Sequence, residues 1–135
     1  MRVVHEADDI IGADEGGDSH VLATEVDIAD STLSQARGLM FRADIPDDYA
    51  LVLDVGDGGM LFGGPSRQFV HMLFMRFPID VLWLVEDEVR KTARFTPWTS
   101  GGFGKADRII ELPAGAAEGV QVGDTVRIEG EDETA

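Results

Sequence analysis

The chain contains no cysteine, so disulfide bonds, thiolate metal sites and a cysteine nucleophile are all excluded. It also lacks a long apolar run. The apolar stretch at residues 81–85, for example, is far shorter than the roughly 20 residues that a membrane-spanning helix needs. Residues 1–20 lack the apolar centre of a signal peptide. These absences predict a cytoplasmic protein with no membrane partner.

Lysine is scarce: Lys91 and Lys105 are the two lysines in a chain with 26 acidic and 11 basic side chains and a net charge of −15. Self-repulsion of this size weakens a compact state in dilute buffer, but molar salt shortens the screening length to about 3 Å. Ion-pair networks of the thermophilic kind need far more lysine than this chain has. The composition therefore predicts a protein of halophilic type. The simpler alternative is an acidic protein without that adaptation.

The charges are distributed unevenly along the chain. Residues 1–66 carry 14 acids and 3 bases, residues 67–108 carry 5 and 7, and residues 109–135 carry 7 and 1. The basic middle region could draw an anionic ligand, or it could neutralise acidic neighbours within the fold. No nucleic-acid partner is expected, because binding to phosphates depends on a surplus of basic groups.

Apolar residues recur mostly with a period of two, in short runs broken by Gly, Pro and Asp, which is typical of a mainly β domain. A capping pattern from Thr32 to Gln35, with Gly38 as a stop, predicts one short helix, and residues 114–124 have room for a second helical turn. We expect a compact β-sandwich or barrel-like sheet with one or two short helices. The predicted strands cover residues 2–6, 20–29, 49–55, 67–75, 79–85, 89–95, 108–113 and 125–129, with a tight turn at 86–88 and a long loop at 96–107.

The length of the chain predicts one globular domain. Residues 1–20 are interpreted as an N-terminal strand followed by an acidic mobile loop, and residues 21–129 as the single β-rich domain. The acidic end of the chain, residues 130–135, is expected to be disordered.

Standard catalytic and cofactor motifs do not match. In the glycine-rich segment "GGFGKAD", Thr99 occupies the first glycine position of a phosphate loop, and Ala106 follows Lys105 where Ser or Thr is required. The dinucleotide-binding template fails at Leu61. The histidines are far apart in the sequence and form no metal-binding motif. We therefore predict no metal and no cofactor.

The most apolar stretch of the chain, "HMLFMRFPIDVLWLVED" at residues 71–87, contains two opposite charges, Arg76 and Asp80. A carboxylate buried alone loses several kcal/mol of hydration, so Asp80 must find a hydrogen-bond donor. A guanidinium group is the natural partner because its planar fork donates two hydrogen bonds to a carboxylate. The candidate partners are Arg37, Arg42 and Arg76.

Five segments resemble the family called domain of unknown function 192: "RGLMFR" at 37–42, "FMRFPIDVLWL" at 74–84, "PW" at 97–98, "IIELPAG" at 109–115 and "VGD" at 122–124. The similarity runs from about Val21 to Ile128. It implies a small, mainly β domain with a barrel-like or sandwich fold, and it implies no settled activity. Many relatives have a tryptophan and a lysine-asparagine pair where this chain has "HMLFMRF", and some bacterial relatives are exported.

Two roles remain open for the charged residues of these segments. Asp80 and one arginine could form a buried pin that fixes the proline corner and the short helix against the sheet. Alternatively, some of Arg37, Arg42 and Arg76 could remain unpaired, next to Asp80, in a cleft roofed by Trp98. His71 and Glu111 would lie at the rim of that cleft, which would suit a small anionic or sugar ligand.

Because no catalytic motif matches, the sequence favours a non-enzymatic ligand-binding module, or a domain whose partner is another protein. The alternative is a small hydrolase or lyase. In that case Asp80 or Glu111 would be the general base, His71 the acid, and Arg42 or Arg76 an anion clamp.

Overall fold

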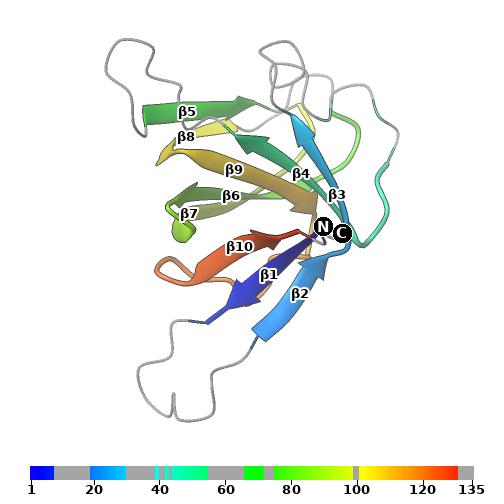
Figure 1. The fold of residues 1–135 in the computed structure, drawn as a ribbon. Coiled ribbons are helices and arrows are strands. Elements are labelled where there is room, and N and C mark those ends of the chain that lie inside the picture. Colours follow the sequence, from blue (N-terminus) through cyan, green and yellow to red (C-terminus); the bar gives the residue numbers. More distant parts are fainter. Residues whose placement is uncertain are drawn as a thin grey trace.

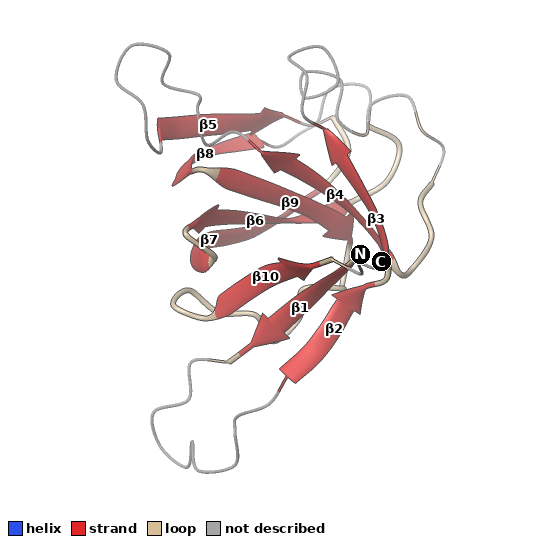
Figure 2. Ribbon diagram, viewed as in Figure 1, coloured by secondary structure: helices blue, strands red, loops and turns tan. Residues whose placement is uncertain are grey.

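The computed structural model describes residues 1–7, 19–29, 39, 42, 44–54, 66–71, 75–98 and 101–130. Strands dominate this part of the chain, as Figures 1 and 2 show, and the prediction of a mainly β fold is confirmed. The described residues contain no helix, and hence none that is long and apolar enough to cross a membrane.

In the described part of the chain, ten strands form one eight-stranded sheet and one two-stranded ribbon. In chain order the strands are β1 (Arg2–Glu6), β2 (Ser19–Ala23), β3 (Glu25–Ala29), β4 (Tyr49–Asp54), β5 (Ser66–His71), β6 (Ile79–Val85), β7 (Glu88–Phe95), β8 (Gly101–Ala106), β9 (Arg108–Pro113) and β10 (Thr125–Glu129). The sheet order is β2-β1-β10-β7-β6-β9-β4-β3, and β5 pairs with β8. All pairings are antiparallel except that of β3 with β4.

The large sheet curls strongly, although it remains open. Its two edge strands, β2 and β3, are separated in the chain by Thr24 alone, so the two edges must meet at that residue (Figure 1). Side chains from both edges, Ala23 of β2 and Val26 of β3, belong to the same apolar cluster. One face of the sheet is therefore an inner face that packs against itself, which gives the barrel-like shape.

Alternation along the central strands creates two cores. On β6, Leu82 and Leu84 point to the inner face, whereas Ile79, Val81 and Trp83 point to the outer face. This double burial explains why β4, β6 and β9 are almost continuously apolar. The segment 114–120, which ends in the buried Val120, closes one end of the inner core.

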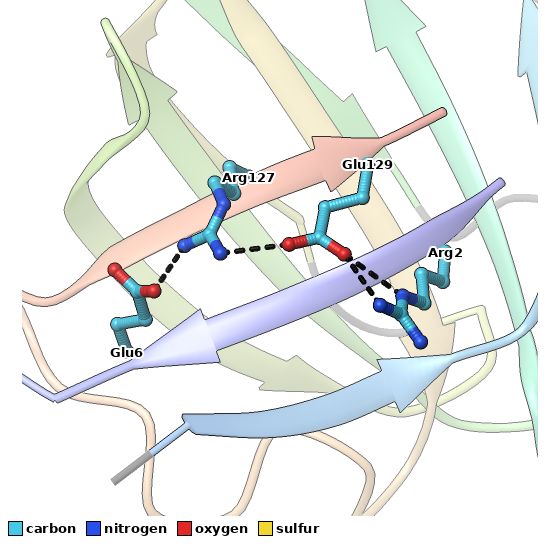
Figure 3. Close-up of polar contacts among 4 residues, drawn as sticks. All are labelled: Arg2, Glu6, Arg127 and Glu129. Carbon is cyan, nitrogen blue, oxygen red and sulfur yellow. Dashed lines mark hydrogen bonds and ion pairs between the residues drawn. The ribbon is translucent and has the colours of Figure 1, made fainter. Parts of the chain in front are cut away.

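The outer face is covered in part by the β5–β8 ribbon, and β8 lies against β6 and β7. A side chain at Gly104 would place its Cβ 2.5 Å from the Trp83 ring, so only glycine permits this approach. Beyond the ribbon, on β1 and β10, the same outer face carries the charged ladder of Figure 3. There Arg127 pairs with Glu6 and Glu129, and Glu129 also accepts from Arg2 Nε at 2.8 Å.

Several sequence predictions differ from the structure. The strand predicted over 20–29 is two strands, because Thr24 and Glu25 donate their N–H groups to the Asp48 carbonyl and the chain passes from one sheet edge to the other. The loop predicted over 96–107 contains β8, whose glycines let it pack on Trp83. Residues 114–119 form turns instead of a helical turn. The helix predicted near Thr32 and the last five residues lie outside the described residues. The acidic loop predicted within residues 1–20 lies largely outside them too, but its last residue, Ser19, begins β2.

We expect Gly104→Ala to lower the free energy of unfolding by about 1–3 kcal/mol, since the added methyl group would overlap the Trp83 ring. Denaturant unfolding measures the change. Gly130→Ala is the matched control, because a Cβ there meets no atom within 4 Å. Equal stabilities of the two variants would contradict the tight packing of β8 on β6.

Candidate functional site

Asp80 is buried at the start of β6, on the inner face of the sheet, and its carboxylate has three donors. Arg94 Nε donates to Oδ1 at 2.8 Å, and the backbone N–H groups of Gly115 and Ala117 donate to Oδ2 at 2.9 and 3.0 Å. The expectation that Asp80 takes a guanidinium partner is confirmed. The partner, however, is Arg94 and none of the arginines nominated from sequence.

The three donors make Asp80 a junction between two parts of the fold. Arg94 lies directly opposite Asp80 on β7, whereas Gly115 and Ala117 belong to the segment that closes the inner core. The buried charge is thus compensated on both oxygens, which avoids the penalty of an unpaired carboxylate. Asp80 and one arginine thus form a pin, but it joins β6 and β7 to the segment 114–120, and the helix that the predicted pin was to fix lies outside the described residues.

A pocket of about 190 Å³ opens beside this junction and is lined by Asp80, Val81, Thr92, Ala93, Arg94 and Ala117. The Arg94 side chain is 55% exposed, and Nε is the atom that binds Asp80. No hydrogen bond to its two terminal amino groups is present among the described residues. Arg94 can therefore offer both groups to a molecule in the pocket.

Arg76 and Trp98 lie beyond the open end of the hairpin that β6 and β7 form. Ile79, the first residue of β6, pairs with Phe95, the last residue of β7, so the chain enters and leaves the hairpin at neighbouring positions. Arg76 is exposed, and Trp98 is 56% exposed with a φ of 68°, an uncommon backbone conformation for a residue other than glycine.

Glu111 is buried in the middle of β9 and points to the outer face of the sheet. Its direct neighbours in the strand register are Leu51 and Val81, both members of the outer core. Burial raises the pKa of Glu111 from 4.5 to about 7. Among the described residues, no hydrogen bond or ion pair reaches this carboxyl group, so it is neutral through the mildly acidic range.

A second polar group lies on the outer face next to Glu111. Tyr49 donates its hydroxyl to Asp27 Oδ2 at 2.9 Å, and the Arg42 guanidinium lies 5.2 Å from the centre of the Tyr49 ring. Burial, and then the hydrogen bond to Asp27, raises the pKa of Tyr49 to about 12. Arg42 therefore pairs with an aromatic ring instead of with Asp80.

Two of the predicted site residues, Asp80 and Glu111, lie on adjacent strands but on different faces of the sheet. Asp80 and Glu111 point to opposite faces, because Glu111 lies opposite Val81, the neighbour of Asp80 on β6. A single pocket that uses both carboxyl groups is therefore excluded. His71 ends β5 opposite Gly101, but its side chain lies outside the described part of the chain, as does Arg37.

The buried His5–Asp124 pair was missed by sequence reasoning. His5 Nε2 lies 2.8 Å from Asp124 Oδ2, which also accepts the N–H of Gln121 at 2.9 Å. The pair joins β1 to the turn before β10, so its role is to fix the N-terminal strand. Within the described ranges, no three His, Asp or Glu side chains are close enough together to hold a metal ion.

The model of one family, DUF192, described as "Uncharacterized ACR", matches residues 13–128. The chain belongs to the DUF192 family. Among functionally curated proteins, none matches the sequence.

Two solved structures resemble this DUF192 domain. A suggested transcription regulator from Sinorhizobium meliloti 1021 has a TM-score of 0.71 at 21% identity, covering 93% of this chain and 92% of its own. A protein of unknown function from Novosphingobium aromaticivorans DSM 12444 has a TM-score of 0.74 at 21% identity, covering 95% of this chain and 84% of its own. At this identity the similarity establishes the fold alone.

The raised pKa of Glu111 predicts a specific pH dependence of stability. The folded state holds this proton more tightly than the unfolded state, so stability falls as pH rises from about 4.5 to 7. We expect Glu111→Gln, which removes this titration, to stabilise the protein relative to the parent by about 3 kcal/mol more at pH 8.5 than at pH 4.

Denaturant unfolding of both proteins at the two pH values measures this difference. Glu25→Gln, at an exposed position, is the control and should leave the pH profile unchanged. If Glu111→Gln changes the free energy of unfolding by the same amount at pH 4 and pH 8.5, the raised pKa of Glu111 is refuted.

Proposed function

We propose that this domain is a binding module that takes a small anion, such as a carboxylate or phosphate, in the pocket beside Asp80 and Arg94. The proposal rests on how Arg94 is bound. Its Nε donates to Asp80, which leaves its two terminal amino groups available at the pocket. A guanidinium fixed in this way loses little further side-chain entropy when it binds an anion.

The surroundings of the pocket support an anionic ligand of small size. Thr92 adds a hydroxyl group to the lining, and the exposed Arg76 lies beyond the same end of β6. Glu118 opposes the anion, because its charge acts on Arg94 together with the stronger effect of Asp80, and both raise the pKa of Arg94. Removing Glu118 should therefore strengthen anion binding.

A nucleic-acid role does not fit this composition. The structural neighbour from Sinorhizobium meliloti is described as a suggested transcription regulator, but a net charge of −15 opposes binding to a phosphate backbone. We infer that any regulation by this chain would act through a small ligand or a protein partner.

The anion proposal can be tested with two variants of opposite expected effect. We expect Arg94→Gln to lower the affinity for inorganic phosphate and acetate by about tenfold or more, because a charge-assisted hydrogen bond is lost. Glu118→Gln should raise the affinity several-fold by removing a repulsive charge. Titration calorimetry at fixed ionic strength measures both, with glucose as an uncharged comparison.

Arg94→Gln should remain folded, because Asp80 keeps two backbone donors and Arg94 is largely exposed. If neither anion binds the parent protein, or if Arg94→Gln binds them equally well, the proposal is refuted. Binding of glucose alone would assign the pocket to sugars instead.

A small hydrolase or lyase is the second candidate function, and one observation favours it. A carboxyl group with a pKa of about 7, like that of Glu111, can both donate and accept a proton at neutral pH. Asp80 is a poor general base in comparison, because three donors already occupy its oxygens. Arg42 lies on the same face of the sheet as Glu111, beside Tyr49.

We further infer a halophilic type of protein and a cytoplasmic location. The excess of acidic over basic side chains supports this, because a cytoplasm rich in KCl would screen the repulsion that dilute buffer leaves in place. The charged ladder of Figure 3 acts in the opposite direction, since salt also screens attraction between exposed charges. The net effect of salt on the free energy of unfolding therefore shows whether relief of repulsion or loss of the ladder's attraction is larger.

We expect the free energy of unfolding to rise as KCl increases from about 0.1 M to about 3 M, because loss of repulsion outweighs loss of the ladder. Equilibrium unfolding at each KCl concentration measures it. Glu129→Gln, which breaks the ladder, should cost stability at low salt and progressively less at high salt. A parent protein that is equally or less stable in 3 M KCl would contradict the halophilic assignment.

A further inference from the structure

Glu111 stands apart from the other buried polar side chains. The structure describes four of these, and three have partners inside the fold: His5 with Asp124, and Asp80 with Arg94 and two backbone N–H groups. For Glu111, which is 6% exposed, no partner is present among the described residues. An unpartnered buried carboxyl group at the centre of a sheet costs stability without contributing to packing.

The residues around Glu111 are apolar and aromatic. Leu51 and Val81 lie directly opposite it on the two neighbouring strands, and Tyr49 and Trp83 lie at diagonal positions, about 7 Å away, toward opposite ends of the sheet. Both rings attract cations in this structure. Arg42 lies 5.2 Å from the centre of the Tyr49 ring, and Lys91 Nζ lies 5.1 Å from that of Trp83.

The outer face around Glu111 thus combines an acid that has no partner among the described residues with apolar neighbours, while the buried Tyr49 and Trp83 rings already hold Arg42 and Lys91. A cationic N–H donor would compensate the carboxylate by charge and by hydrogen bonding, whereas an anion would be repelled and a neutral hydroxyl group would bring no charge. We propose that Glu111 is the anionic half of a second binding site, for a small apolar ligand that carries a protonated amine. This site is independent of the anion pocket on the inner face.

The pH dependence of this binding follows from the two partners. The ligand must be protonated and Glu111 ionised, so affinity should be greatest between pH 7 and the pKa of the amine and should fall about tenfold per pH unit below 7. Among the described residues, the charged groups beside Tyr49 and Trp83 are Asp27, Arg42 and Lys91, and the charged ladder on β1 and β10 lies farther along the same face. Tyr49 stays neutral throughout, since burial and Asp27 raise its pKa to about 12.

The test measures the binding of n-butylamine and benzylamine to the full chain at pH 8.5 and pH 5.5, by calorimetry and by the shift in melting temperature. n-Butanol and benzyl alcohol are the uncharged comparisons. We expect the amines to bind at pH 8.5 at least about 30-fold more tightly than at pH 5.5. The alcohols should bind weakly and equally at both pH values.

The Glu111→Gln variant should lose the pH-dependent part of amine binding. Amine binding that persists unchanged in Glu111→Gln, or that is absent from the parent at pH 8.5, overturns the proposal. If this variant fails to fold, the parent alone decides, because equal affinity at the two pH values refutes the role of Glu111. Arg94→Gln should bind amines normally, so loss of phosphate binding there separates the two sites.

Discussion

The fold depends on the compensation of one buried charge, the Asp80 carboxylate. Its three donors come from two places, Arg94 on β7 and the backbone of Gly115 and Ala117 in the segment that closes the inner core. Removing the carboxylate would leave these donors without their acceptor at once. The same contact orients Arg94, so the interaction that joins the sheet to the segment 114–120 also prepares the arginine for a ligand.

The alternation of side chains along the central strands separates the chemistry of the two faces. Asp80 and Glu111 lie on adjacent strands, yet one points to the inner face and the other to the outer face. The inner carboxylate accepts three hydrogen bonds, whereas no hydrogen bond reaches the outer carboxyl among the described residues, and burial raises the pKa of Glu111 to about 7. The anion pocket and the amine site are therefore separate hypotheses, each with its own variant.

A β-bulge explains why the partner of Asp80 was not found from sequence. The hairpin of β6 and β7 was predicted correctly, and a regular hairpin that pairs Leu84 with Val89 would place Ala93 opposite Asp80. The register shifts between Trp83 and Leu84, so Arg90 has no partner on β6. As a result Arg94, and not Ala93, lies opposite Asp80. One inserted residue thus decides which side chain meets the buried acid, and no composition or period reveals it.

The sequence by itself determined the mainly β class, most of the strands, the family and the need of Asp80 for a guanidinium partner, because these follow from local periodicity, motifs and the cost of burying a charge. Only the tertiary structure decided that Arg94 is that partner, that Asp80 and Glu111 face apart, and that β8 packs on Trp83. Those outcomes depend on register and on the curling of the sheet, which arise from contacts between residues far apart in the chain.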